Sequence, residues 1–215
     1  LMDAIYLRQV SPQNPQLLLD LARDPSPLGR ARLSALLLNG GPWSRLDKNA
    51  AFLPGVGEKP PMAGFYPTDA TKGEIDAWLA RLAAPERERA LGFYSVIRRT
   101  PEGRLSTVPY SLEYQGELAQ AAAHLRSAAG ATQEATLKAF LSARADAFLS
   151  NDYLRSDMLW MELNSAVEPT IGPYETYEDE WYGAKAAFEA FITVRDEAET
   201  QRLQRYSAHL QDIED

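Results

Sequence analysis

Apolar side chains recur every three or four positions along most of the chain, a spacing that is typical of helices. Leucines follow this rhythm in residues 1–38, where prolines divide the segment into two or three short helices. Thr71 and Thr132 each precede a new apolar stripe and are expected as helix N-caps. The pattern predicts further helices at 71–82, after Pro85, at 112–129, 132–148 and 152–163, and from Ala184 to the end.

One segment has the character of a β-hairpin. Residues 93–99 are rich in β-branched and aromatic side chains, and residues 100–103 contain turn formers. Residues 104–110 are then expected to form the second strand of the hairpin. Between residues 39 and 71, many prolines and glycines predict a long irregular segment that aromatic side chains pin to the body. We therefore expect a mostly α fold with a small β element, an α+β protein with one hairpin near residues 93–110.

Composition removes several classes of function. Acidic residues outnumber lysine plus arginine by 30 to 22, and this excess argues against a nucleic-acid partner, which needs a positive field. The absence of cysteine excludes thiolate nucleophiles, cysteine-bound zinc and iron–sulfur clusters. His124 and His209 are too far apart to form a zinc motif, so we interpret both as helix-surface residues. The sequence contains no membrane-length apolar run, nucleophile elbow, phosphate loop or Nudix box.

Both ends suggest a piece of a longer protein. Leu1 already stands in helical rhythm with no capping residue before it, and residues 201–215 stop inside a charged helical pattern. No signal peptide is visible, and none is expected if the natural start lies upstream. The compartment stays open between the cytoplasm and the periplasm, for a soluble protein.

The segment 167–183 concentrates carboxylates among aromatic rings. Pro169 forces extended backbone on Glu168, so the Glu168 carboxylate projects from a stiff base. Such a carboxylate can hold a substrate ammonium through charge-assisted hydrogen bonds. The alternative is an acidic, solvated loop that caps the next helix. The residues alone leave both interpretations open.

Three short runs of residues between positions 167 and 191 form one block, whose pattern can be compared with known families without a gap. They are Val167-Glu168, Ile171-Gly172-Pro173-Tyr174-Glu175-Thr176-Tyr177-x-Asp179 and Gly183-x-Lys185-Ala186-Ala187-Phe188-Glu189-Ala190-Phe191. The block resembles the dipeptidyl peptidase III family of zinc metallopeptidases, in its bacterial branch. Weaker similarity to the same branch lies at residues 41–47, 65–69, 108–110 and 151–161.

The resemblance implies a two-lobed enzyme that removes dipeptides from peptide N-termini. In this family a His-Glu-x-x-Gly-His motif or a close variant, with a later glutamate, holds zinc downstream of the matching block. Residues 1–215 are then a single upstream lobe that contains no metal ligands and no catalytic residues of its own. This lobe divides into a mixed part, residues 1–111, and a helical part, residues 112–215. Its expected partners are a peptide substrate and the missing zinc-binding lobe.

The resemblance also implies roles for four residues. Glu168 aligns with a family glutamate that binds the free ammonium of the substrate. Thr170 replaces a tyrosine of the eukaryotic pattern, which helps to stabilise the reacting carbonyl. Tyr174 and Glu175 are expected either to line the cleft or to fix the start of the next helix. Two alternatives stay open, a non-catalytic peptide-binding module and a helical interaction domain.

Overall fold

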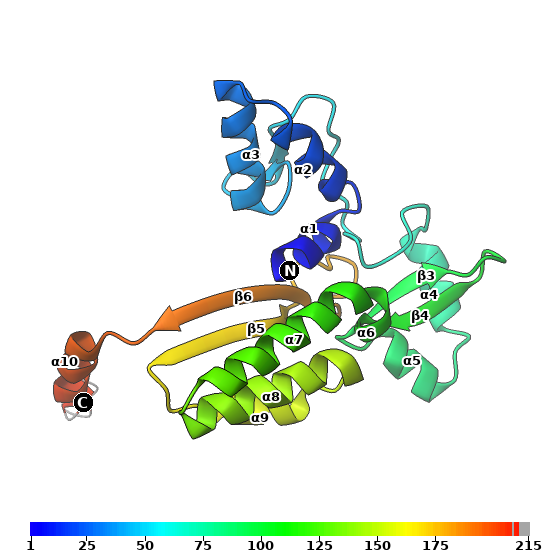
Figure 1. Cartoon of the computed structure of the whole chain (residues 1–215). Helices are drawn as coiled ribbons and strands as arrows, with labels where there is room; N and C mark the ends of the chain where they lie inside the picture. Colours follow the sequence, from blue (N-terminus) through cyan, green and yellow to red (C-terminus); the bar gives the residue numbers. More distant parts are fainter. Residues whose placement is uncertain (208, 211–215) are drawn as a thin grey trace.

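The computed structural model describes residues 1–207 and 209–210, and it begins with three short helices (Figure 1). They are α1 (Met2–Val10), α2 (Asn14–Ala22) and α3 (Pro27–Asn39). The Ser26 hydroxyl caps α3 by accepting a hydrogen bond from the Gly29 amide at 3.0 Å. Gly40, at φ 67°, ends α3 in the left-handed conformation that glycine adopts most easily. The predicted division of residues 1–38 into short helices is confirmed.

The segment that follows is irregular, as its prolines and glycines predict. It contains two-residue strands only, β1 (Trp43–Ser44) and β2 (Ala50–Ala51). Aromatic side chains pin it to the body: Phe65 and Tyr66 are buried, and the Trp43 indole donates to the Gly57 carbonyl at 2.9 Å. The helices α4 (Lys72–Leu79) and α5 (Ala84–Ala90) come next, and Thr71 caps α4 as predicted.

The predicted hairpin is confirmed, as strands β3 (Ser95–Arg99) and β4 (Leu105–Pro109). Four helices follow it, α6 (Tyr110–Glu113), α7 (Gln115–Ala131), α8 (Ala135–Ser150) and α9 (Leu154–Met161). The prediction that Thr132 caps α8 is wrong. Thr132 has extended backbone at the end of α7, and α8 begins after Glu134.

The prediction of one long helix from Ala184 onward is also wrong. Residues 187–194 form strand β6 (Ala187–Val194), which pairs antiparallel with β5 (Val167–Glu175). Only then does α10 (Glu197–Ser207) begin, and the last predicted helical positions, 208 and 211–215, lie outside the described residues. Pairing with β5 overrides the helix propensity of the alanine-rich start of β6.

The ribbon of β5 and β6 lies between α1 and the helices α7, α8 and α9 (Figure 1). Phe188 fixes the ribbon to the core, since its ring lies 5.6 Å from that of Tyr110, 5.8 Å from that of Tyr114 and 6.1 Å from that of Phe148. The other end of the ribbon extends away from the helices toward α10 and exposes apolar side chains of β6, namely Phe191, Ile192 and Val194.

Candidate functional site

The candidate substrate residues lie on strand β5, whose first half follows directly from its own sequence. Pro169 restricts the backbone of Glu168 to the extended region, and Glu168 pairs with Thr193 of β6. Because side chains alternate along a strand, Glu168, Thr170 and Gly172 share one face of the ribbon. The extended backbone predicted for Glu168 is therefore confirmed.

The carboxylate of Glu168 is exposed and uncommitted. In the described part of the chain no side chain forms a hydrogen bond or an ion pair with it; only the Glu168 backbone carbonyl is engaged, by the Thr193 hydroxyl at 3.2 Å. Thr170, the next residue on this face, is half-buried and pairs with Phe191 of β6. The face thus presents one free negative charge beside a hydroxyl group and an exposed aromatic ring.

Tyr174 has a structural position. Its hydroxyl donates back to the Ile171 carbonyl of its own strand at 3.3 Å, and the Arg144 guanidinium lies 5.5 Å from the centre of its ring. Burial raises the pKa of Tyr174 to about 12. The strand register shifts between Pro173 and Glu175, so the side chains no longer continue the alternation of the first half.

Glu175 lies at the far end of β5, about 23 Å along the strand from Glu168 at the usual rise per residue. It is exposed and lines a cavity of about 300 Å³ with Glu189, Tyr177 and Phe191. Burial and the neighbouring charge of Glu175 raise the pKa of Glu189. The structure thus brings Glu168 and Thr170 together and separates Glu175 from them.

The acidic loop between the strands is not the solvated helix cap that composition allows. Asp179 is buried, and its two carboxylate oxygens accept five hydrogen bonds, all within 3.2 Å. The donors are the Tyr66 hydroxyl and the backbone amides of Trp181, Tyr182, Ala184 and Lys185. The element that follows is a strand, so no helix dipole is involved. Asp179 therefore shapes the turn that returns the chain to β6.

Glu178 is also fully buried and joins three distant segments. It accepts hydrogen bonds from the Tyr6 hydroxyl, at 2.9 Å, and from Arg45, while Lys59 lies 3.2 Å from its second oxygen. Burial acts to raise the pKa of Glu178, but the charges of Lys59 and Arg45 outweigh burial and hold it below its ordinary value. Sequence composition could not separate Glu178 from a surface carboxylate, because its partners lie more than 110 residues upstream.

Lys185 lies at the bottom of the same loop and has no exposed surface. Its ammonium group donates to the backbone carbonyls of Ala90 and Gly92, at 2.6 and 3.0 Å, and to the Ser95 hydroxyl at 2.9 Å. Burial lowers the pKa of Lys185 to about 8, against the influence of Asp179, which raises it. The lysine therefore ties the loop before β6 to the start of β3.

Another buried charge, Arg144, was not among the candidates from the sequence. It stands in the apolar stripe of α8, four residues after Phe140 and four before Phe148, and has no exposed surface. A charged residue within a buried helical stripe is the signal that could have identified it. Its guanidinium pairs with Asp157 of α9 at 2.6 Å.

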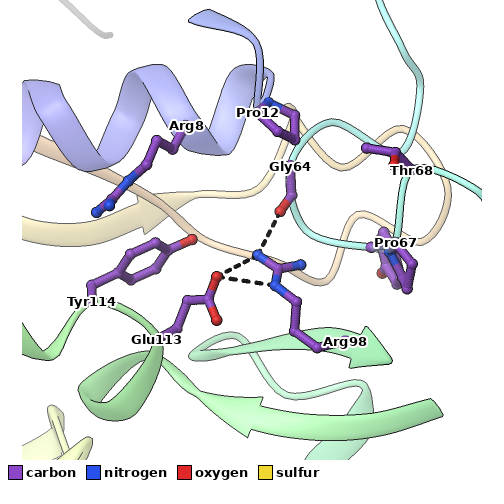
Figure 2. A pocket seen from close by; sticks show the side chains of 9 residues that line it. Arg8, Pro12, Gly64, Pro67, Thr68, Arg98, Glu113 and Tyr114 are labelled. Carbon is purple, nitrogen blue, oxygen red and sulfur yellow. Dashed lines mark hydrogen bonds and ion pairs between the residues drawn. The ribbon is translucent and has the colours of Figure 1, made fainter. Parts of the chain in front are cut away.

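A cavity of about 310 Å³ opens between α1, the irregular segment and the hairpin (Figure 2). Arg98 donates to Glu113, at 2.6 and 3.0 Å, and to the Gly64 carbonyl at 3.0 Å. Arg8 lies 2.7 Å from Glu117 and stacks over Tyr114. Each cation already faces a carboxylate, so this cavity presents no free charge to a ligand.

The structure contains no site for a metal ion among residues 1–207 and 209–210, where no three histidine, cysteine, aspartate or glutamate side chains are suitably grouped. His124 is exposed on α7, and His209 is exposed in the turn after α10. No helix in the described part of the chain is both long enough and apolar enough to cross a membrane.

Comparisons with known proteins give a consistent answer. Residues 99–212 match the family model described as peptidase family M49. The chain is 36% identical to a protein named Nudix hydrolase 3 from Arabidopsis thaliana, over an alignment that covers 100% of this chain and 34% of that protein. That name describes the plant protein, of which this chain matches about a third, and residues 1–215 contain no Nudix box.

Two solved structures are similar over 98% of the chain. Dipeptidyl-peptidase III from Corallococcus sp. strain EGB is 58% identical with a TM-score of 0.90, and this chain covers 39% of it. DPP III from Caldithrix abyssi is 41% identical with a TM-score of 0.88, and this chain covers 40% of it. The chain thus spans 34 to 40% of the length of these relatives.

Proposed function

The chain belongs to peptidase family M49, and on this premise we propose that it is the part of a longer dipeptidyl peptidase that holds the amino end of the peptide substrate. Family M49 is zinc-dependent, but the described residues offer no ligand set for zinc. We therefore assign metal binding and bond cleavage to the part of the protein outside this chain. The proposed role of these 215 residues is recognition.

The uncommitted carboxylate of Glu168 is the observation that carries this proposal. Among the described residues no cation neutralises it, whereas Glu178 and Asp179, ten and eleven residues further on, are buried and held by internal partners. Its extended backbone is restricted by Pro169 and by pairing with β6. A carboxylate held in this way gives strong, directional hydrogen bonds to an ammonium group.

The neighbouring residues of the same face suit the first residues of a peptide. Thr170 offers a hydroxyl group that can donate to a carbonyl oxygen or accept from an amide. Phe191 is 58% exposed and offers an apolar surface beside it. We assign Tyr174 to the support of β5, and Glu175 to the cavity that it shares with Glu189, which adjoins this face at Phe191.

The test is a Glu168→Gln variant of the complete protein. Two peptides are compared, one with a free amino terminus and its desamino counterpart, in which hydrogen replaces the amine. Losing the charge should lower kcat/KM for the free peptide by about 100-fold, the usual worth of a charge-assisted hydrogen bond. The inhibition constant of the desamino peptide should not change.

Glu88→Gln, on the exposed surface of α5, is the matched control and should leave both values unchanged. Equal effects of Glu168→Gln on the two peptides would contradict recognition of the amine. Normal peptide binding without any cleavage by the complete wild-type protein would instead support a non-catalytic binding module.

A further inference from the structure

The burial of Arg144 is energetically unfavourable, because it removes a charged side chain from water. Arg144 has no exposed surface, and among residues 1–207 and 209–210 its one carboxylate partner is Asp157, at 2.6 Å. Its Nε and Nη1 atoms are buried without hydrogen-bond partners in the described structure. A buried ion pair is commonly no more stable than well-packed apolar residues of the same volume. Core packing alone therefore does not account for an arginine at this position.

Aromatic rings hold the guanidinium group in place. Its central carbon lies 5.4 Å from the ring centres of Phe140 and Tyr153 and 5.5 Å from that of Tyr174. Attraction between the cation and these ring faces compensates part of the lost hydration. The rings come from α8, from the residue before α9, and from β5, so the guanidinium is the point where these three elements meet.

Gly172 of β5 leaves room for this guanidinium because it has no side chain. A Cβ atom at residue 172 would lie 2.5 Å from Nη1 of Arg144 and 3.4 Å from the ring of Tyr174. Any side chain there would displace the guanidinium or the strand. Gly172 has φ 154°, which favours glycine as well. The guanidinium and the Tyr174 ring thus fill the position that a side chain at residue 172 would take.

This position lies on the face that carries the proposed recognition residues. Glu168, Thr170 and Gly172 lie at alternate positions of β5 and so on one face. Arg144 packs against this face at Gly172. Movement of the strand at Gly172 would shift Thr170 two residues away and Glu168 four residues away. Beyond Gly172 the register of the ribbon changes, so pairing with β6 does not fix the strand there by itself.

We propose that Arg144 is a positioning residue, which sets the course of β5 and thereby the places of Glu168 and Thr170 relative to the peptide substrate. This inference rests on the proposed function, because it assumes that Glu168 binds the amine. Asp157 orients the guanidinium from α9, and Tyr174 closes over it from the strand itself. Arg144 touches neither the substrate nor the reacting atoms.

The experiment uses the complete protein and four variants, Arg144→Met, Arg144→Lys, Glu168→Gln and the double variant of Arg144→Met with Glu168→Gln. Arg126→Met is the matched control, because Arg126 likewise joins two neighbouring helices through a carboxylate, α7 to α8 through Asp146 at 2.8 Å, but on the exposed surface. KM and kcat are measured on the free peptide, and the inhibition constant on its desamino counterpart. All measurements are made well below the unfolding midpoint of every variant.

Arg144→Met should raise KM for the free peptide about tenfold and raise the inhibition constant of the desamino peptide by a smaller factor, because the desamino peptide keeps only the contact with Thr170. Arg144→Lys, which keeps the charge but loses the planar fork, should lie between wild type and Arg144→Met. The double variant should bind the free peptide more weakly than Glu168→Gln alone only by the small factor that Arg144→Met adds for the desamino peptide, because both changes remove the same interaction of Glu168 with the amine. Arg126→Met should behave as wild type.

A merely structural role gives a different result. Loss of folded protein lowers kcat for every substrate and leaves KM unchanged. An Arg144→Met variant with that behaviour, or with no effect beyond Arg126→Met, overturns the positioning role while Glu168→Gln still supports recognition of the amine. If Glu168→Gln itself leaves KM unchanged, the proposed function fails, and the positioning of Glu168 fails with it.

Discussion

The side-chain amide of Gln9 on α1 forms hydrogen bonds with the backbone on either side of Ala187, at the start of β6, as the backbone of a neighbouring strand would. Its oxygen accepts a hydrogen bond from the Phe188 backbone amide at 2.7 Å, and its nitrogen donates to the Ala186 carbonyl at 3.3 Å. Gln9 and Phe188 are both fully buried and lie 179 residues apart in the sequence. One polar side chain thus fixes the ribbon of β5 and β6 to the amino-terminal helix.

Replacing Gln9 by alanine should destabilise the protein by about 2 kcal/mol, because it leaves the Phe188 backbone donor unsatisfied in the core, whereas the Ala186 carbonyl keeps its hydrogen bond from the Tyr110 hydroxyl. Chemical denaturation monitored by tryptophan fluorescence measures this loss. Gln120→Ala, on the exposed side of α7, is the control and should change stability by less than about 0.5 kcal/mol. A loss for Gln9→Ala as small as that of the control would contradict the bridging role.

Asp179→Asn should lower the free energy of unfolding by about 3 kcal/mol or more. One oxygen of Asp179 accepts hydrogen bonds from one O–H and two N–H donors. An amide nitrogen in its place could not accept them, so these donors would be left unsatisfied. Thermal unfolding is a suitable measurement. Glu180→Gln, at a half-exposed neighbour that contacts Lys59, should lower the midpoint far less. Equal midpoints for the two variants would argue against a turn organised by Asp179.

Lys185 should make stability depend on pH in the alkaline range. Its pKa in the folded protein, about 8, lies below the ordinary value of 10.5, so between these values the unfolded chain binds more protons. The free energy of unfolding therefore gains a contribution that rises with pH, by up to about 1.4 kcal/mol per pH unit. Lys185→Met should remove this rise. Denaturation series from pH 7.5 to 10.5 on both proteins test it, and parallel curves would contradict it.

Glu189 should act in the opposite direction. Burial and Glu175 raise its pKa, so the folded protein holds the proton more tightly, and stability falls as the pH rises above the ordinary carboxyl range. Glu189→Gln should therefore stabilise the protein at pH 7, by about 0.5 kcal/mol or less because solvent screens the group. The stabilisation should vanish at pH 3, where both states carry the proton. Urea denaturation at the two pH values makes the comparison.

The two hairpins show what local sequence can and cannot predict. The hairpin of β3 and β4 has β-rich arms and a four-residue turn, so its signal is entirely local. The ribbon of β5 and β6 has a weaker local signal, a β-rich run only at the end of β6, from Phe191 to Val194. Pro169, Gly172 and Pro173 interrupt one arm, the alanine-rich start of β6 suits a helix, and residues 176–186 separate the arms. Pairing with β5 and contacts with α1 and the core therefore select the strand at the start of β6.

The candidate site divides in a similar way. The extended backbone of Glu168 follows from Pro169 alone and was predictable from the sequence. The separation of exposed Glu168 from buried Glu178 and Asp179 was not, because it depends on Tyr6, Arg45 and Tyr66, more than 110 residues upstream. The roles assigned to Glu168, Thr170, Tyr174 and Glu175 remain predictions.

The bond between Gln9 and Phe188 also sets an order of events during synthesis. A ribosome adds about 5–20 residues per second, so α1 emerges roughly 10–40 s before Phe188 is made. Throughout that interval the apolar residues of α1 that become buried, such as Ile5 and Val10, lack the ribbon beside them. Helix α1 is therefore made long before Phe188 but is among the last elements of this chain to complete its packing.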